Sequence, residues 1–155
     1  MLFRSVTGTP SANFANANVG TAKSVTVTGY TAPSSNYTIT QPTGLTANIT
    51  TASLTITADN VYKVSGTALS SPVTGSVDFT STGLVNGETV GSVTITYGTG
   101  AASGAAAGTY VGSVTPSAAT GGTFTSSNYS ITYVSGNIIV GNQITCIAKI
   151  GRAHV

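Results

Sequence analysis

The chain has 155 residues and a mass of 15.3 kDa, its formal net charge is +2, and only 5% of its residues are charged. This length allows one ordinary domain or two small ones and excludes a large enzyme, while the single cysteine, Cys146, excludes an internal disulfide framework. No apolar run approaches the roughly 20 residues that a membrane helix needs, so we expect no membrane insertion.

The two ends of the chain carry most of its positive charge, in Arg4, Lys149 and Arg152, and also the only histidine, His154. The opening MLFRS and the closing KIGRAHV can be read from DNA strings that are reverse complements over a shared stem, and both resemble a sequencing adapter translated in opposite orientations. We therefore expect residues 1–5 and 149–155 to be adapter artefacts flanking a shotgun-library fragment, with residues 142–148 as a linker.

Between these ends, aliphatic or aromatic residues alternate with hydroxyl-bearing residues in a series of short segments. A period of two over so many segments predicts β-strands with one buried and one exposed face. The first half contains KSVTVTG at 23–29, NYTIT at 36–40, LTANIT at 45–50 and SLTIT at 53–57, with inward residues Val25, Val27, Tyr37, Ile39, Leu45, Ala47, Ile49, Leu54 and Ile56. The second half contains VYKV at 61–64, SVTITY at 92–97, TYVGSV at 109–114 and NYSITY at 128–133, with inward residues Val93, Ile95, Tyr97, Tyr110, Val114, Tyr129, Ile131 and Tyr133.

Two loops separate strands in the second half. Asn86 and Gly87 readily adopt positive φ angles, which predicts a tight two-residue hairpin turn. The segment GTGAASGAAAG at 98–108 lacks the glycine spacing and the Lys-Ser/Thr ending of a phosphate-binding loop, so we interpret it as a structural connector.

A heptad occurs twice with one change, as SSNYTIT at 34–40 and SSNYSIT at 126–132. In each copy the asparagine, Asn36 or Asn128, can close a turn, and the tyrosine, Tyr37 or Tyr129, can begin a strand that covers the core edge. The repeat predicts an all-β fold of two small tandem antiparallel β modules, at residues 6–57 and 58–141, with the first truncated. Each module has either an immunoglobulin-like sandwich or a β-grasp-like topology.

Two family resemblances follow from these motifs. Residues 13–50, from NFANANVGT to GLTANIT, resemble the C-terminal half of the YDG domain of bacterial surface proteins, although the tripeptide that names that family is absent. Residues 61–140 resemble the MBG domain, through Gly83-Leu84-Val85-Asn86-Gly87, Gly108-Thr109-Tyr110, Asn128-Tyr129 and Gly136, although Tyr62 precedes Lys63 where that family usually has glycine. The resemblance implies an extracellular stalk of a filamentous haemagglutinin-like adhesin, with neighbouring modules as partners.

The residues that could perform chemistry are few. Outside the ends the chain has two lysines and three acids, so the net charge of this part is −1. It therefore lacks the basic surface that nucleic-acid binding requires. The residues are Lys23, Lys63, Asp59, Asp78 and Glu88. We interpret the acids as turn and strand-edge residues and the lysines as solvated, because the acids have no clustered spacing and no histidine accompanies them. We expect no catalytic residue, metal or cofactor.

One aromatic residue and three sequons complete the candidates for binding or modification. Tyr30 lies in the segment TGYTAPSS, which we predict to be a loop, and is the aromatic residue that we propose for ligand contact. Asn36, Asn48 and Asn128 begin Asn-x-Ser/Thr sequons, which arise easily by chance in a Thr-rich chain. A non-catalytic adhesin stalk, with a surface receptor or glycan as a further partner, is the leading hypothesis. A carbohydrate-binding module of a secreted polysaccharide-degrading enzyme is the alternative.

Overall fold

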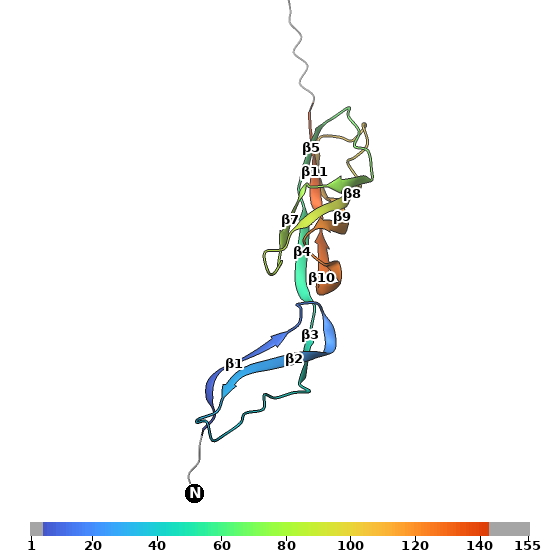
Figure 1. The fold of residues 1–155 in the computed structure, drawn as a ribbon. Helices are drawn as coiled ribbons and strands as arrows, with labels where there is room; N and C mark the ends of the chain where they lie inside the picture. Colours follow the sequence, from blue (N-terminus) through green and yellow to red (C-terminus); the bar gives the residue numbers. More distant parts are fainter. Residues whose placement is uncertain (1–4, 143–155) are drawn as a thin grey trace, which may run out of the picture. The chain divides into compact units, whose positions relative to one another are not determined.

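The computed structural model describes residues 5–142, and the chain divides into two compact units with the boundary between Thr51 and Ala52 (Figure 1). The predicted boundary between 57 and 58 therefore lies too late in the sequence, because the strand at Ala52–Ala58 pairs within the second unit. The predicted adapter segment at 149–155 lies outside the described residues, as do residues 1–4 of the other adapter segment and residues 143–148 of the predicted linker.

The first unit is a single antiparallel sheet in the order β1-β2-β3, with β1 at Thr7–Phe14, β2 at Gly20–Thr31 and β3 at Thr46–Ile49. Val25 and Val27 are half-buried on one face of β2, and Thr26 and Thr28 are exposed on the other, as the alternation predicts. No residue between 5 and 51 is fully buried. The first unit therefore has a sheet with an apolar face but no closed core.

The second unit contains two sheets that enclose one core, which confirms the all-β class and is consistent with a sandwich. A three-stranded sheet has the order β10-β4-β7, from Tyr129–Val134, Ala52–Ala58 and Phe79–Thr82. A five-stranded sheet has the order β5-β11-β9-β8-β6, from Val61–Val64, Gly136–Gly141, Gly108–Gly122, Val90–Tyr97 and Val73–Ser76. A short 3₁₀ helix, η1, spans Ser126–Asn128 directly before β10.

Alternation along the strands fills this core. Every second residue of β4 points inward, so Leu54 and Ile56 are fully buried while the threonines between them are not. They pack with side chains from β8, β9, β10 and β11, namely Val93, Ile95, Val114, Tyr129, Ile138 and Val140, together with Ala58. The burial predicted for SLTIT, SVTITY and TYVGSV is therefore confirmed.

Two pairings are parallel, which differs from the antiparallel modules expected from the sequence. β4 pairs with β10, and β5 pairs with β11, so two consecutive strands run beside two others as the chain passes from one sheet to the other (Figure 1). The crossing is held where Asn137 N donates to Asn60 Oδ1 at 2.8 Å. A Cβ atom at Gly136 would lie 2.5 Å from Asp59 O, so this crossing requires glycine.

Three predicted features differ in detail from the structure. Asn86 and Gly87 form the predicted tight turn, with φ angles of 55° and 70° and a 3.0 Å bond from Glu88 N to Val85 O. The turn does not make a hairpin, because the strands on either side of it, β7 and β8, belong to different sheets. Leu45 and Ala47 are exposed because β3 ends the sheet with no second layer over it among residues 5–51, and Tyr133 is 37% exposed at the end of β10.

The two units share one substructure. The order β1-β2-β3 matches β8-β9-β11, and each middle strand begins with Gly-Thr and contains a bulge. In both units a residue of that middle strand with positive φ donates its N–H to an asparagine from the last strand: Ala22 N to Asn48 Oδ1 at 2.8 Å, and Gly112 N to Asn137 Oδ1 at 3.0 Å.

The heptads begin with the same turn in both units. Tyr37 N donates to Ser34 O at 3.2 Å, and Tyr129 N donates to Ser126 O. After the turn the copies diverge, because Tyr129 enters β10 and is 6% exposed, whereas residues 36–40 lie outside the strands and Tyr37 is 48% exposed. The strand predicted at 36–40 is therefore wrong, and its counterpart at 128–133 is confirmed.

Candidate functional site

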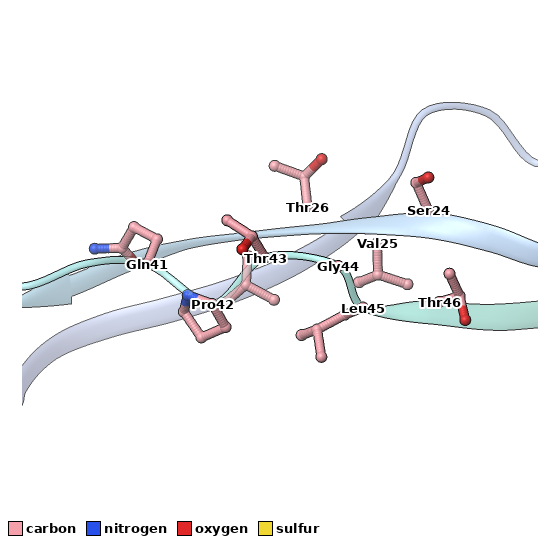
Figure 2. Close-up of a pocket in the computed structure, with 10 residues that line it drawn as sticks. Ser24, Val25, Thr26, Gln41, Pro42, Thr43, Gly44, Leu45 and Thr46 are labelled. Atoms are coloured by element: carbon pink, nitrogen blue, oxygen red, sulfur yellow. The ribbon is translucent and has the colours of Figure 1, made fainter.

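A hollow of about 330 Å³ lies in the first unit between β2 and the segment at 41–46 (Figure 2). Figure 2 shows Val25, Pro42 and Leu45 on one side of the ribbons, with Ser24 and Thr26 on the other. Val25 N donates to Leu45 O at 2.9 Å, which fixes the segment beside β2. The alternation of β2 therefore lines the hollow with aliphatic side chains.

A second hollow of about 220 Å³ adjoins the same proline. Its lining residues are Val6, Tyr30, Ile39, Thr40 and Pro42. The Gln41 side chain brackets the backbone of Tyr30, because Tyr30 N donates to Gln41 Oε1 at 3.2 Å and Gln41 Nε2 donates to Tyr30 O at 2.8 Å. We call the two hollows together the unit 1 groove.

The unit 1 groove carries no charge. Lys23 is the only charged residue between 5 and 51, and its Nζ donates to Asn16 Oδ1 at 2.6 Å and to Asn16 O at 3.2 Å, away from the lining residues of both hollows. The groove therefore offers aliphatic and hydroxyl surface, with no acid or base for proton transfer. Such a surface suits an uncharged, extended chain better than a charged ligand.

Tyr30 occupies a different setting from the one predicted. It is part of β2, not a loop, and it is 37% exposed at the edge of the smaller hollow. Its ring can still contact a bound molecule, but its neighbours there are Val6, Ile39 and Pro42. The sequence missed Gln41, since only the folded chain brings residues eleven apart into two hydrogen bonds.

A third hollow, of about 340 Å³, lies on the outer face of the second unit between β5 and β11. Its lining residues are Tyr62, Lys63, Val64, Ile139 and Gly141. Tyr62 is 73% exposed there, which is more than Tyr30, Tyr37 or Tyr133.

Lys63 is not solvated, which corrects the interpretation from sequence. Only 9% of the residue is exposed, and its Nζ donates to Thr67 O at 2.8 Å and to Ala102 O at 2.7 Å. These bonds join the end of β5 to the segment at 98–108, where Ala101 O also accepts from Leu69 N at 2.9 Å. The Gly- and Ala-rich segment therefore acts as a structural connector with defined partners.

The acids have separate, local partners. Glu88 is half-buried and Tyr129 Oη donates to its Oε2 at 2.6 Å, while Tyr129 Oη accepts from Val85 N at 3.1 Å. This hydrogen bond to the carboxylate raises the pKa of Tyr129 above its ordinary value. Glu88 thus orders the turn at 85–88, instead of adding solubility at a strand edge. Asp78 accepts from Ser76 Oγ at 3.1 Å, and Asp59 N donates to Asp78 O at 3.1 Å.

The remaining motif residues have structural positions. A Cβ at Gly83, where φ is +100°, would collide with Ser53 O, so β4 and β7 can approach only because residue 83 is glycine. Tyr110 packs against the core and its Oη donates to Ala106 O at 3.0 Å. Asn36 is exposed and Asn128 half-buried in the two heptad turns, whereas the Asn48 side chain already accepts from Ala22 N.

Within residues 5–142 the structure contains no group of three or more side chains that could hold a metal ion. Over the same range, no helix is long and apolar enough to cross a membrane. A family model described as the MBG domain (YGX type) matches residues 54–139, which covers nearly all strands of the second unit. No curated protein and no solved structure matches the chain.

Proposed function

Because the chain belongs to the MBG domain (YGX type) family, we propose that it is a non-catalytic segment of a large bacterial surface or secreted adhesin and acts as part of an extended stalk. The family match over the second unit is the observation that carries this proposal, since the MBG domain is a repeat family of the surface-adhesin type. Tandem β units of this size extend in proportion to their number, so reach is a function that they can supply without a ligand.

We also propose a family for the first unit, an origin for the two ends of the chain and a location for the protein. We assign the first unit to the C-terminal half of a YDG-like module because residues 13–50 resemble that module, and the Asn-Val-Gly-Thr motif of the resemblance leads into β2. We retain the adapter origin of residues 1–5 and 149–155 as a hypothesis about the DNA. The proposed location is the bacterial cell surface or the extracellular space, with neighbouring modules of the same protein as the first partners.

The side chains support a non-catalytic role. Two of the three acids use their carboxylates in local structural contacts, Glu88 with Tyr129 and Asp78 with Ser76. The unit 1 groove is uncharged. A neutral surface rich in hydroxyl groups suits a spacer that must not bind charged partners indiscriminately.

Small-angle scattering from chains that carry one, two and four copies of residues 6–142 tests the stalk proposal. A rod doubles its maximum dimension when the copy number doubles, whereas a compact globule grows only about 1.3-fold. We expect doubling, and a dilution series is the control for self-association. Growth near the value for a globule would contradict the stalk.

A carbohydrate-binding module remains the second candidate, and one observation favours it. Tyr62 is 73% exposed beside a hollow of about 340 Å³, a placement that allows a sugar ring to stack on the phenol. A glycan array on the chain, with the Tyr62→Ala and Tyr30→Ala variants beside it, distinguishes the candidates. A specific signal lost in either variant supports the sugar-binding module, and an array without signal supports the stalk.

A further inference from the structure

The shared substructure allows the second unit to serve as a template for the first. In the second unit, the strand that follows the heptad turn, β10, lies against β4 with Ile131 opposite Leu54. β4 in turn covers the core with its two fully buried side chains, Leu54 and Ile56. In the first unit the residue at the position of Ile131 is Ile39, which follows the same turn and lines the unit 1 groove.

The segment at 37–41 contacts the middle strand of its unit as β10 contacts β9 in the second unit. Gln41 occupies the same place after the heptad turn as Tyr133, and both side chains bond to the middle strand. Tyr30 N donates to Gln41 Oε1 at 3.2 Å, and Ala119 N donates to Tyr133 Oη at 2.9 Å. What differs is the next layer, because the described residues of the first unit include no strand equivalent to β4.

We propose that the unit 1 groove is a docking site for an extended β-strand with the residue pattern of β4, aligned parallel to residues 37–42. The incoming strand places a leucine or isoleucine opposite Ile39 and over Val25, and exposes serine or threonine at the alternate positions. This inference stands independently of the stalk proposal, because it rests on the internal repeat and the exposed apolar face.

Charge and burial identify the occupant. The groove has no charged lining residue, so an uncharged strand of aliphatic and hydroxyl side chains matches it. A folded second copy of this chain cannot supply its own β4, because both edges of that strand are paired, with β10 and with β7, and its aliphatic side chains are buried. The occupant is therefore a separate extended segment of this chemistry, bound by strand addition.

A synthetic peptide with the sequence of residues 50–58, TTASLTITA, is the probe. Titrated into the full ¹⁵N-labelled chain, it should cause saturable amide shifts in residues 37–46 and in β2, and none in the second unit. The register in the second unit places Ala52 opposite Tyr129 and Thr57 opposite Val134. A nitroxide on the N-terminus of the peptide should therefore broaden Thr38 more than Thr43, and a nitroxide on its C-terminus should do the reverse.

Matched variants separate docking from adventitious association. Ile39→Asp places a charge in the groove and should weaken peptide binding at least about tenfold, since one buried aliphatic side chain contributes that much. Thr38→Asp adds the same charge at an exposed neighbouring residue and should leave binding within about twofold. If Ile39→Asp disturbs the sheet, a peptide with aspartate in place of its leucine leaves the protein unchanged and should also bind at least about tenfold more weakly.

Four outcomes would overturn the proposal. The first is the absence of saturable shifts, and the second is the reversed broadening pattern of an antiparallel strand. The third is a set of shifts confined to β1 or to β3, which would show that the peptide extends an edge of the sheet and leaves the groove empty. Self-association that displaces the peptide would likewise show that a second copy occupies the groove, against the occupant proposed here.

Discussion

Replacement of Leu54 by alanine should destabilise the second unit far more than the same change at Leu45 affects the first. Leu54 is fully buried between the two sheets, and Leu45 is 44% exposed beside the unit 1 groove. A buried Leu→Ala change costs about 2–5 kcal/mol of unfolding free energy, because it removes transfer free energy and leaves a cavity, and we expect about 3 kcal/mol here. At Leu45 no closed cavity forms, so the cost should stay below about 1 kcal/mol.

Thermal unfolding followed by circular dichroism measures both effects. For a domain the size of the second unit, about 3 kcal/mol lowers the midpoint by about 12–24 °C. The Leu54→Ala chain should therefore melt far below the parent chain, while Leu45→Ala should shift the main transition by only a few degrees. Equal shifts for the two variants would refute the conclusion that the second unit alone has a closed core.

Two further variants examine the polar contacts that the sequence did not reveal. Lys63→Met should speed hydrogen exchange at the Gly66 and Leu69 amides at least about tenfold, because the segment at 98–108 loses the ammonium that holds it, and Lys23→Met should leave those amides unchanged. The hydrogen bond to Glu88 raises the pKa of Tyr129 above 10.0. The contribution of this bond to stability is therefore fully present below pH about 10, and it is lost as the pH rises through the folded-state pKa of Tyr129. Tyr129→Phe should therefore lower the urea midpoint of unfolding at neutral pH, and the midpoint of the variant should fall less than that of the parent chain above pH about 10. An equal fall in the variant and the parent would contradict the role assigned to the Tyr129–Glu88 bond.

The second unit could be predicted well from its alternating strands, because a period of two specifies which side chains are buried once a second layer covers them. Leu54, Ile56, Val93, Ile95 and Val114 are buried for this reason. The pairing direction could not be predicted, since parallel and antiparallel strands show the same alternation. The parallel pairs β4–β10 and β5–β11 depend on the passage of the chain between sheets at 59–60, which no local pattern specifies.

The same alternation predicted a strand in the first unit that the structure does not contain. Residues 36–40 repeat the heptad of the second unit nearly letter for letter, yet they lie outside the strands because strand formation also needs a neighbouring backbone. The environment of Lys63 was missed for a related reason. Its acceptors are backbone carbonyls, one of them 39 residues away, and carbonyl groups leave no signature in a sequence.

The position of the unit boundary determines whether the second unit, expressed alone, retains its core. A chain that begins at residue 58, the boundary predicted from sequence, lacks β4 and with it Leu54 and Ile56, whereas one that begins at Ala52 keeps the whole three-stranded sheet. Loss of two fully buried aliphatic side chains removes about 4–10 kcal/mol from a total stability that is typically about 5–15 kcal/mol. Residues 52–142 should therefore show a cooperative thermal unfolding transition. Residues 58–142 should show no cooperative thermal transition, and the amide signals in their NMR spectrum should not be dispersed. Equal melting temperatures for the two chains would show that β4 is dispensable, and the template used for the unit 1 groove would then lose its basis.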